Sequence, residues 1–143
     1  MTNQSVENSL LQEIDSILSA EMPIPSYDDS KLLKYTTATI YETLRLYPIV
    51  PVNGKDEKIW GEDAKQFNPK RFLNSEDGLR PNKFKFASFH AGPRTWLVLL
   101  IIVLNNLNLK LVPGQKSPPE FGEAITLPMK DPLMTKVSYR TKI

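Results

Sequence analysis

The stretch Phe84–Val98 constrains the fold of this chain more than any other. It contains three phenylalanines, a Gly-Pro turn, one arginine and one tryptophan within 15 residues, and it leads directly into the most apolar segment of the sequence. A composition of this kind is typical of a rigid loop that lies against a flat and apolar surface. We therefore interpret the remaining chain as a support for this loop, and we expect the chemistry of the loop to decide the function.

The apolar segment that follows the loop is too short to cross a membrane. Its longest uninterrupted run, Trp96–Leu104, has nine residues, whereas a helical span of a bilayer needs about 20. The residues Met1–Asn8 are polar and contain no apolar core of a signal peptide. With 143 residues, of which 41% are hydrophobic and 24% are charged, the chain has the length and composition of one globular domain. We therefore expect a single domain without a membrane span.

Charge and cysteine content exclude several classes of function. The net charge is only +2 and no block of lysine or arginine stands out, so we expect no nucleic-acid partner. The sequence has no cysteine, which excludes disulfides, thiolate metal ligands and thiol nucleophiles together. Its 12 prolines require that several connections are extended or turned rather than helical.

Hydrophobic periodicity predicts three helices in the first third of the chain. Val6–Ala20 has apolar residues at three- and four-residue spacing, which is typical of an amphipathic helix. A short capped helix follows and extends through Leu33. A stronger helix covers Thr36–Tyr47, and Pro48 ends it.

Two charged residues of the last of these helices, Glu42 and Arg45, are three positions apart and therefore share one face. On spacing alone, such a pair is typical of a solvated ion pair that contributes roughly a few tenths of a kcal/mol. The spacing by itself therefore predicts an exposed pair.

The later segments predict β-structure, with one ambiguity. Ile49–Asn53 is short and apolar and predicts a strand, whereas the charged Gly54–Gln66 predicts a loop or a weak helix. Leu97–Leu109 is apolar all round and fits a buried helix or a buried strand, and its β-branched residues favour the strand. Near the C-terminus, Ala124–Met129 and Leu133–Tyr139 predict the two strands of a hairpin that turns between them.

Three short motifs follow one another along the chain and together resemble one family. The first is Glu42-Thr43-Leu44-Arg45, followed by Leu46-Tyr47-Pro48, and it is similar to the Glu-x-x-Arg helix of cytochrome P-450 haem-thiolate monooxygenases. The second is Phe67-x-Pro69-x-Arg71-Phe72, which resembles the Pro-Glu-Arg-Phe segment of that family, with Lys70 where glutamate is usual. It is preceded by Trp60-Gly61-Glu62-Asp63-Ala64. The third is Phe89-His90-Ala91-Gly92-Pro93-Arg94, which resembles the first part of the haem-binding loop, Phe-x-x-Gly-x-Arg-x-Cys-x-Gly.

The resemblance covers nearly the whole chain and implies a fold that is mainly α with small β-hairpins, as the C-terminal portion of the cytochrome P-450 fold. It implies one partial domain over residues 1–143. This domain would contain two N-terminal helices, the Glu-x-x-Arg helix, a meander, the remnant of the haem loop and a C-terminal hairpin. Pro118–Arg140 resembles the C-terminal hairpin of the family, and most of all that of fungal enzymes that hydroxylate fatty acids and alkanes at the chain end.

The resemblance also implies cofactors, partners and a cellular location. By family, these are a haem cofactor with its iron, a reductase that donates electrons, a long-chain, lipid-like substrate, and the endoplasmic reticulum membrane. The family's membrane anchor is missing from this chain, so the expected location of the chain itself is cytoplasmic or unknown.

The resemblance assigns two groups of residues. Glu42, Arg45 and Arg71 would form the family's buried network, in which one carboxylate is shared between two guanidinium groups and the role is structural. The residues Phe89, Gly92 and Arg94 would belong to the haem loop. There Phe89 would pack beside the proximal sulfur, Gly92 would supply the turn, and Arg94 would reach a haem propionate.

The sequence departs from the family at the iron ligand. The cysteine position of the loop is occupied by Trp96, whose indole N–H is a donor only and has no lone pair for iron. The glycine two residues later is replaced by Val98. The single histidine, His90, lies six residues too early and is more typical of a hydrogen-bonded loop residue. The sequence therefore predicts no catalytic residue, no metal ligand and doubtful haem binding.

Three interpretations remain open. The first is a truncated and internally shortened cytochrome P-450 relative that is catalytically inactive. The second is a non-catalytic interaction module that uses its apolar faces to bind a partner. The third is an incomplete gene model of an active monooxygenase, with segments missing between Asn53 and Gly54 and around Trp96-Leu97.

Overall fold

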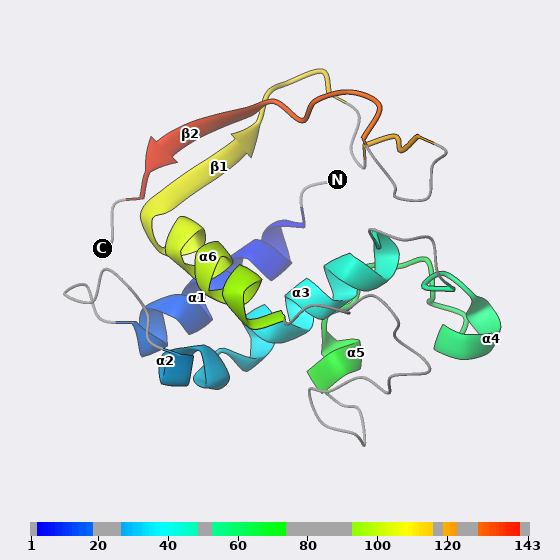
Figure 1. The fold of residues 1–143 in the computed structure, drawn as a ribbon, viewed down its shortest axis with the longest axis horizontal. Helices are drawn as coiled ribbons and strands as arrows, with labels where there is room; N and C mark the ends of the chain where they lie inside the picture. The colour runs from blue at the N-terminus through cyan, green and yellow to red at the C-terminus, as the bar shows by residue number, and fades with distance from the viewer. Residues whose placement is uncertain are drawn as a thin grey trace. The chain divides into compact units, whose positions relative to one another are not determined.

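The computed structural model describes residues 3–18, 27–48, 53–73, 93–115, 119–122 and 129–140. Its elements are α1 (Gln4–Ile17), α2 (Tyr27–Leu32), α3 (Lys34–Leu46), α4 (Glu57–Trp60), α5 (Lys70–Leu73), α6 (Pro93–Asn106), β1 (Leu107–Leu111) and β2 (Thr135–Tyr139) (Figure 1). Helices predominate and the two strands form one small antiparallel sheet, which confirms the predicted fold class.

The chain divides into two compact units. The first unit takes its residues from 1–33, 94–122 and 128–143, and so contains α1, α2, α6 and both strands. The second unit takes its residues from 34–93 and 123–127, and contains α3, α4 and α5.

The helix α1 begins where a side chain can cap it. Asn3 is the N-cap residue, and its side-chain oxygen accepts a hydrogen bond from the backbone N–H of Val6. The predicted apolar stripe is the buried face, because Val6, Ile14 and Leu18 are all buried. The predicted helix, Val6–Ala20, starts two residues after the start of α1 and ends three residues after its end.

Most of Leu97–Leu109 is helical and belongs to α6, so the strand that its β-branched residues favoured was wrong there. The helix begins at Pro93, where the ring's fixed φ and missing N–H suit a first helical position, and it continues to Asn106. Its described side chains include the fully buried Ile101. Burial in a helical core has therefore outweighed the strand propensity of the β-branched residues, which is only a weak preference.

The strand β1 starts directly after α6 and pairs with β2. The antiparallel register runs from Leu107 opposite Tyr139 to Leu111 opposite Thr135. The predicted strand Leu133–Tyr139 corresponds to β2, and its partner among the described residues is β1. Of the other predicted strand, Ala124–Met129, only Met129 lies within the described residues, and it forms an isolated bridge with Phe121. The pairing of these two predicted strands therefore stays a prediction.

Arg140, which follows the end of β2, contacts two helices of the first unit. Its backbone N–H donates to the carbonyl of Asn106, at an N···O distance of 2.8 Å. Its guanidinium forms an ion pair with Asp15 of α1 and reaches the carbonyl of Leu104 at 3.4 Å. One residue thus links α1, α6 and β2.

The second unit has a small core beneath α3. Ala38, Trp60, Ala64 and Phe72 are buried together. The ring centroid of Phe72 lies 5.9 Å from that of Trp60 and 5.6 Å from that of Tyr41, in tilted arrangements. The predicted helix Thr36–Tyr47 is α3, and Pro48 follows it as expected. The predicted strand Ile49–Asn53 lies outside the described residues except for Asn53.

Candidate functional site

The pair Glu42 and Arg45 is the centre of the second unit. Both side chains are 0% exposed to solvent. The Nε and Nη2 atoms of Arg45 donate to the two carboxylate oxygens of Glu42, each at 2.7 Å, so the contact is bidentate. The exposed pair that the spacing alone predicted was therefore wrong. The pair is fully buried, because the chain that follows α3 folds over it.

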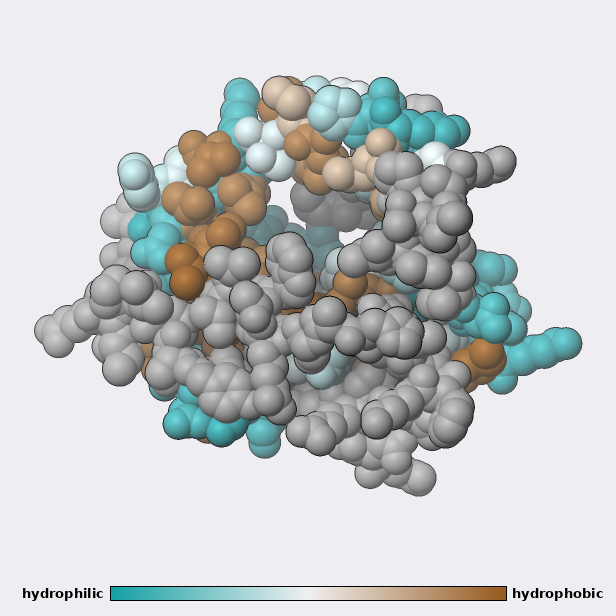
Figure 2. Space-filling model, in the orientation of Figure 1, coloured by the Kyte–Doolittle hydropathy of each residue, from teal (hydrophilic) through white to brown (hydrophobic). Residues whose placement is uncertain are grey.

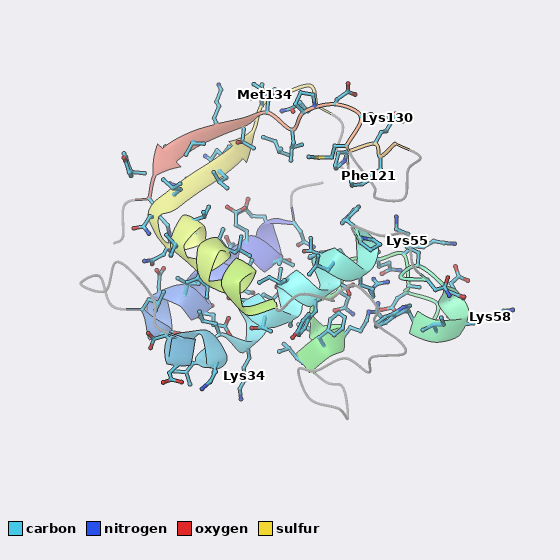
Figure 3. The ribbon with its side chains drawn as sticks, in the orientation of Figure 1. Lys34, Lys55, Lys58, Phe121, Lys130 and Met134 are labelled. Carbon is cyan, nitrogen blue, oxygen red and sulfur yellow. The ribbon has the colours of Figure 1, made fainter. Side chains whose placement is uncertain are left out.

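The loop over this pair, residues 53–68, contains only the four-residue helix α4, so most of its carbonyls need partners from elsewhere. Arg45 supplies three of them, because its Nη1 donates to the carbonyls of Gly54 and Ala64 and its Nη2 donates to that of Gln66. The guanidinium also lies 5.2 Å from the ring centroid of Trp60. In Figure 3, Lys55 and Lys58 mark the start of this loop and α4.

Gly54 lets the loop pass directly over the end of α3. A Cβ atom at this position would overlap the backbone carbonyl oxygen of Arg45. Gly54 is buried, and its own carbonyl accepts from the Arg45 guanidinium. The close approach of the two backbones therefore depends on the absence of a side chain.

The Glu42 carboxylate has few acceptor sites left beyond those that Arg45 uses. Its Oε1 also accepts from the backbone N–H of Asn68, at 2.8 Å. Its Oε2 lies 3.7 Å from the Nε of Arg71, which is an ion pair but is longer than a hydrogen bond. The structure thus brings the three residues of the predicted network together, with Glu42 much closer to one arginine than to the other.

Arg71, at the start of α5, is held mainly by the turn after α4. Its Nη1 donates to the carbonyl of Trp60 and to Oδ1 of Asp63, each at 2.9 Å. Its Nη2 lies 2.7 Å from Oδ2 of Asp63 and donates to the carbonyl of the same residue at 3.2 Å. The Arg71 guanidinium, through its hydrogen bond, holds the pKa of the Asp63 carboxyl below its ordinary value.

Asp63 is the member of this site that the sequence reasoning did not assign. It lies in the Trp60–Ala64 motif that precedes the second of the three matching motifs. Asp63 lies in the turn after α4 and Arg71 in α5, so the two share no helix or strand and spacing could not pair them. The turn at Gly61, where φ is 88°, reverses the chain and brings them together.

The residues of the predicted haem loop are covered only in part. Phe89, His90 and Gly92 lie outside the described residues. The backbones of Arg94 and Trp96 belong to the first turn of α6, but their side chains lie outside the described part of the structure. The assignments of Phe89, Gly92 and Arg94 to a haem loop therefore stay predictions.

The donor groups of the chain do not fit a thiolate-ligated haem iron. The whole sequence contains no cysteine, and the thiolate is the ligand that favours O–O cleavage in haem monooxygenases. Within the described residues, no three His, Cys, Asp or Glu side chains come close enough together to hold a metal ion. In the same part of the chain, no helix has both the length and the apolar character that a membrane span requires.

Residues 1–54 match the family described as Cytochrome P450, a range that includes Glu42 and Arg45. Cytochrome P450 94B3 of Arabidopsis thaliana is 28% identical over 99% of this chain and 36% of its own length. Alkane hydroxylase MAH1 of the same plant is 28% identical over 79% of this chain and 30% of its own length. Cytochrome P450 monooxygenase cyp1 of the fungus Mycosarcoma maydis is 27% identical over 98% and 30%, respectively.

These relatives have additional sequence both outside the aligned region and within it. The chain spans about a third of the length of the curated relatives it matches. The alignment with cytochrome P450 94B3 also extends over 184 positions, although the chain has only 143 residues, so at least 41 of these positions are filled in the relative alone. The relatives include a fungal enzyme and an alkane hydroxylase, as the motifs led us to expect. Over nearly its whole length, the chain is similar to cytochrome P450 proteins.

Proposed function

We propose that this chain is a shortened cytochrome P450 segment that keeps the structural network of the fold and does not itself catalyse thiolate-dependent monooxygenation. The proposal rests on one observation. The chain matches cytochrome P450 proteins but contains no cysteine. A haem iron in this family needs a thiolate to push electron density toward bound oxygen. In the motif order, Trp96 stands where that thiolate is required, and an indole cannot replace it.

The activity of complete relatives supplies the context of this proposal. One matching relative is named as an alkane hydroxylase. By its resemblance to the cytochrome P450 family as a whole, a complete protein of this kind would hydroxylate a long-chain aliphatic substrate, receive electrons from a reductase and work at the endoplasmic reticulum membrane. Phe89, Gly92 and Arg94 would be the remnant of its haem loop, and residues 1–143 would form one partial domain.

The carbon monoxide difference spectrum of the reduced chain, after incubation with haemin, tests the proposal. We expect no thiolate-type Soret band from the chain as it is. The matched variant is Trp96→Cys, which restores sulfur at the proposed ligand position and changes nothing else. A thiolate-type band from the unchanged chain would refute the inactivity. If neither protein gives the band, the inactivity stands and the assignment of the haem loop loses its support.

An incomplete gene model is an alternative, and the alignment length favours it. At least 41 aligned positions of cytochrome P450 94B3 have no counterpart in this chain. If exons are missing, transcript reads will contain additional coding sequence between Asn53 and Gly54 or around Trp96-Leu97. Reads that cross both points without interruption would exclude this candidate.

A non-catalytic interaction module is the other alternative, and exposed apolar residues support it. Val137 and Tyr139 of β2 are 57% and 88% exposed, and Leu109 of β1 and Met134 are exposed as well. Apolar atoms gather over α6 and the small sheet on the viewed face in Figure 2. This candidate requires that the purified chain is monodisperse and unfolds in one cooperative thermal transition. Aggregation of the isolated chain would contradict it.

A further inference from the structure

Arg71 and Glu42 are close but do not form a direct hydrogen bond. The Nε of Arg71 is the guanidinium nitrogen that faces Glu42, at 3.7 Å from Oε2. This nitrogen is buried and has no hydrogen-bond partner in the described part of the chain. By contrast, both terminal nitrogens of Arg71 contact Asp63, the shorter contact being 2.7 Å. The position of Arg71 is therefore set by Asp63 and by the carbonyls of the same turn.

Glu42 is already engaged by other donors. Arg45 donates two hydrogen bonds to it and the backbone N–H of Asn68 donates a third, all between 2.7 and 2.8 Å. One carboxylate balances one guanidinium in charge, so a second guanidinium held next to this pair needs a second carboxylate. The side chain of Arg71 is only 14% exposed, which makes water a poor substitute.

We propose that Asp63 is the positioning residue for Arg71 and the fourth member of the network, which thereby becomes a neutral set of two carboxylates and two guanidinium groups. Arg45 donates hydrogen bonds to the loop carbonyls of Gly54, Ala64 and Gln66. Arg71 donates to the carbonyl of Trp60 and to the carbonyl and carboxylate of Asp63. This assignment concerns the second unit alone and holds whether or not the chain binds haem.

The geometry of the turn explains why an aspartate can do this. Gly61 ends α4 with φ of 88° and ψ of 177°, a backbone conformation that is open almost only to glycine. The chain then reverses, so that the carboxylate and the backbone carbonyl of Asp63 both face the Arg71 guanidinium. The side chain of Asp63 is 41% exposed, and this carboxylate is therefore the one acidic member of the network that solvent protons reach directly.

Side-chain NMR of arginine in the full chain tests the assignment. The Nε–Hε signal of Arg71 is identified by its loss in Arg71→Lys. We expect Asp63→Asn to shift this signal and to remove its protection from exchange, and Asp63→Glu to restore part of the protection. The matched control is Glu57→Gln, which removes a carboxylate from an equally short but exposed ion pair, that of Glu57 with Lys65 at 2.8 Å. It should leave the Arg71 signal unchanged.

Titration of the Asp63 carboxyl in the unchanged chain provides a second readout, which does not depend on the folding of any variant. The charged group that faces this carboxyl is Arg71 of α5, with Glu42 of α3 behind it. We expect Asp63 to titrate below its ordinary value of 3.8. Titration at the ordinary value, or an Arg71 signal that is equally unchanged in Asp63→Asn and Glu57→Gln, would overturn the proposal.

Discussion

Replacing Arg45 by methionine is the most direct test of the buried network, because methionine keeps much of the length of the side chain and removes all its polar contacts. The guanidinium donates two hydrogen bonds to the buried carboxylate of Glu42. It also donates to three backbone carbonyls, those of Gly54, Ala64 and Gln66. The substitution therefore leaves one buried negative charge and three carbonyls without their donors.

The size of the effect follows from these contacts. Removing one partner of a buried ion pair costs about 3–5 kcal/mol. Each carbonyl that stays buried without a donor adds about 1–3 kcal/mol. Since a whole domain is stable by only about 5–15 kcal/mol, we expect a loss of at least about 4 kcal/mol and a second unit that is largely unfolded in water. Replacing Glu42 by glutamine in the same chain should recover part of this loss, because the uncompensated charge disappears.

Tryptophan fluorescence gives an assay that is specific for the second unit. The chain has two tryptophans, so a Trp96→Phe background leaves Trp60 as the single reporter. Trp60 is buried and lies against the Arg45 guanidinium. Urea unfolding in this background, with and without Arg45→Met, measures the loss of stability from the shift of the midpoint at constant slope.

The control and the refuting result are equally specific. Lys65→Met removes a cation from the exposed pair with Glu57, whose N···O distance of 2.8 Å is close to that of the buried pair. It should leave the midpoint nearly unchanged, because exposed pairs are screened by solvent. If Arg45→Met changes the stability by less than about 1 kcal/mol, the range found for exposed pairs, then the pair is solvated and the reasoning about burial is wrong.

Three further outcomes are expected. Gly54→Ala should lower the thermal midpoint of the second unit strongly, because the new Cβ would overlap the Arg45 carbonyl oxygen; an unchanged midpoint would mean that the loop does not cross α3 this closely. Gly61→Ala should cost about 1–3 kcal/mol in urea unfolding, because φ of 88° with ψ of 177° suits almost only glycine. The pH dependence has a definite sign. Folding lowers the pKa of Asp63, so the stability it contributes is fully present above the ordinary value of 3.8 and is lost as the pH falls through the folded-state pKa. An acid titration of Trp60 fluorescence should show this loss, and Asp63→Asn should remove that part of it.

Local sequence patterns were sufficient for the helices of the first third and insufficient for the apolar segment. The helices α1 and α3 follow from apolar spacing and from Pro48, which are properties of a few adjacent residues. The segment from residue 97 to 109 is apolar on all sides, so its periodicity could not decide between helix and strand. The alternation of Leu107, Leu109 and Leu111, which marks β1, was obscured by the asparagines around it.

For the site, local patterns were insufficient for a different reason. Spacing placed Glu42 and Arg45 on one face of a helix, but their burial depends on a loop that folds back from up to 26 residues away. Only the order of the three motifs along the chain indicated a buried network. Asp63 stayed unassigned because its pairing with Arg71 depends on the reversed backbone at Gly61, and neither propensity nor charge pattern encodes that turn.

The link between Arg140 and Asp15 has a consequence for how the chain is made. These residues are 125 positions apart, and they belong to a unit whose sequence is interrupted by most of the other unit. During synthesis, residues 34–73 can acquire their network as soon as they have left the ribosome, because all its members lie within that interval. The helix α1 is synthesised before this central part, yet the ion pair between Asp15 and Arg140 can close only after 125 further residues have been added. We expect nascent chains that stop before Arg140 to contain a protease-resistant central part between unprotected ends.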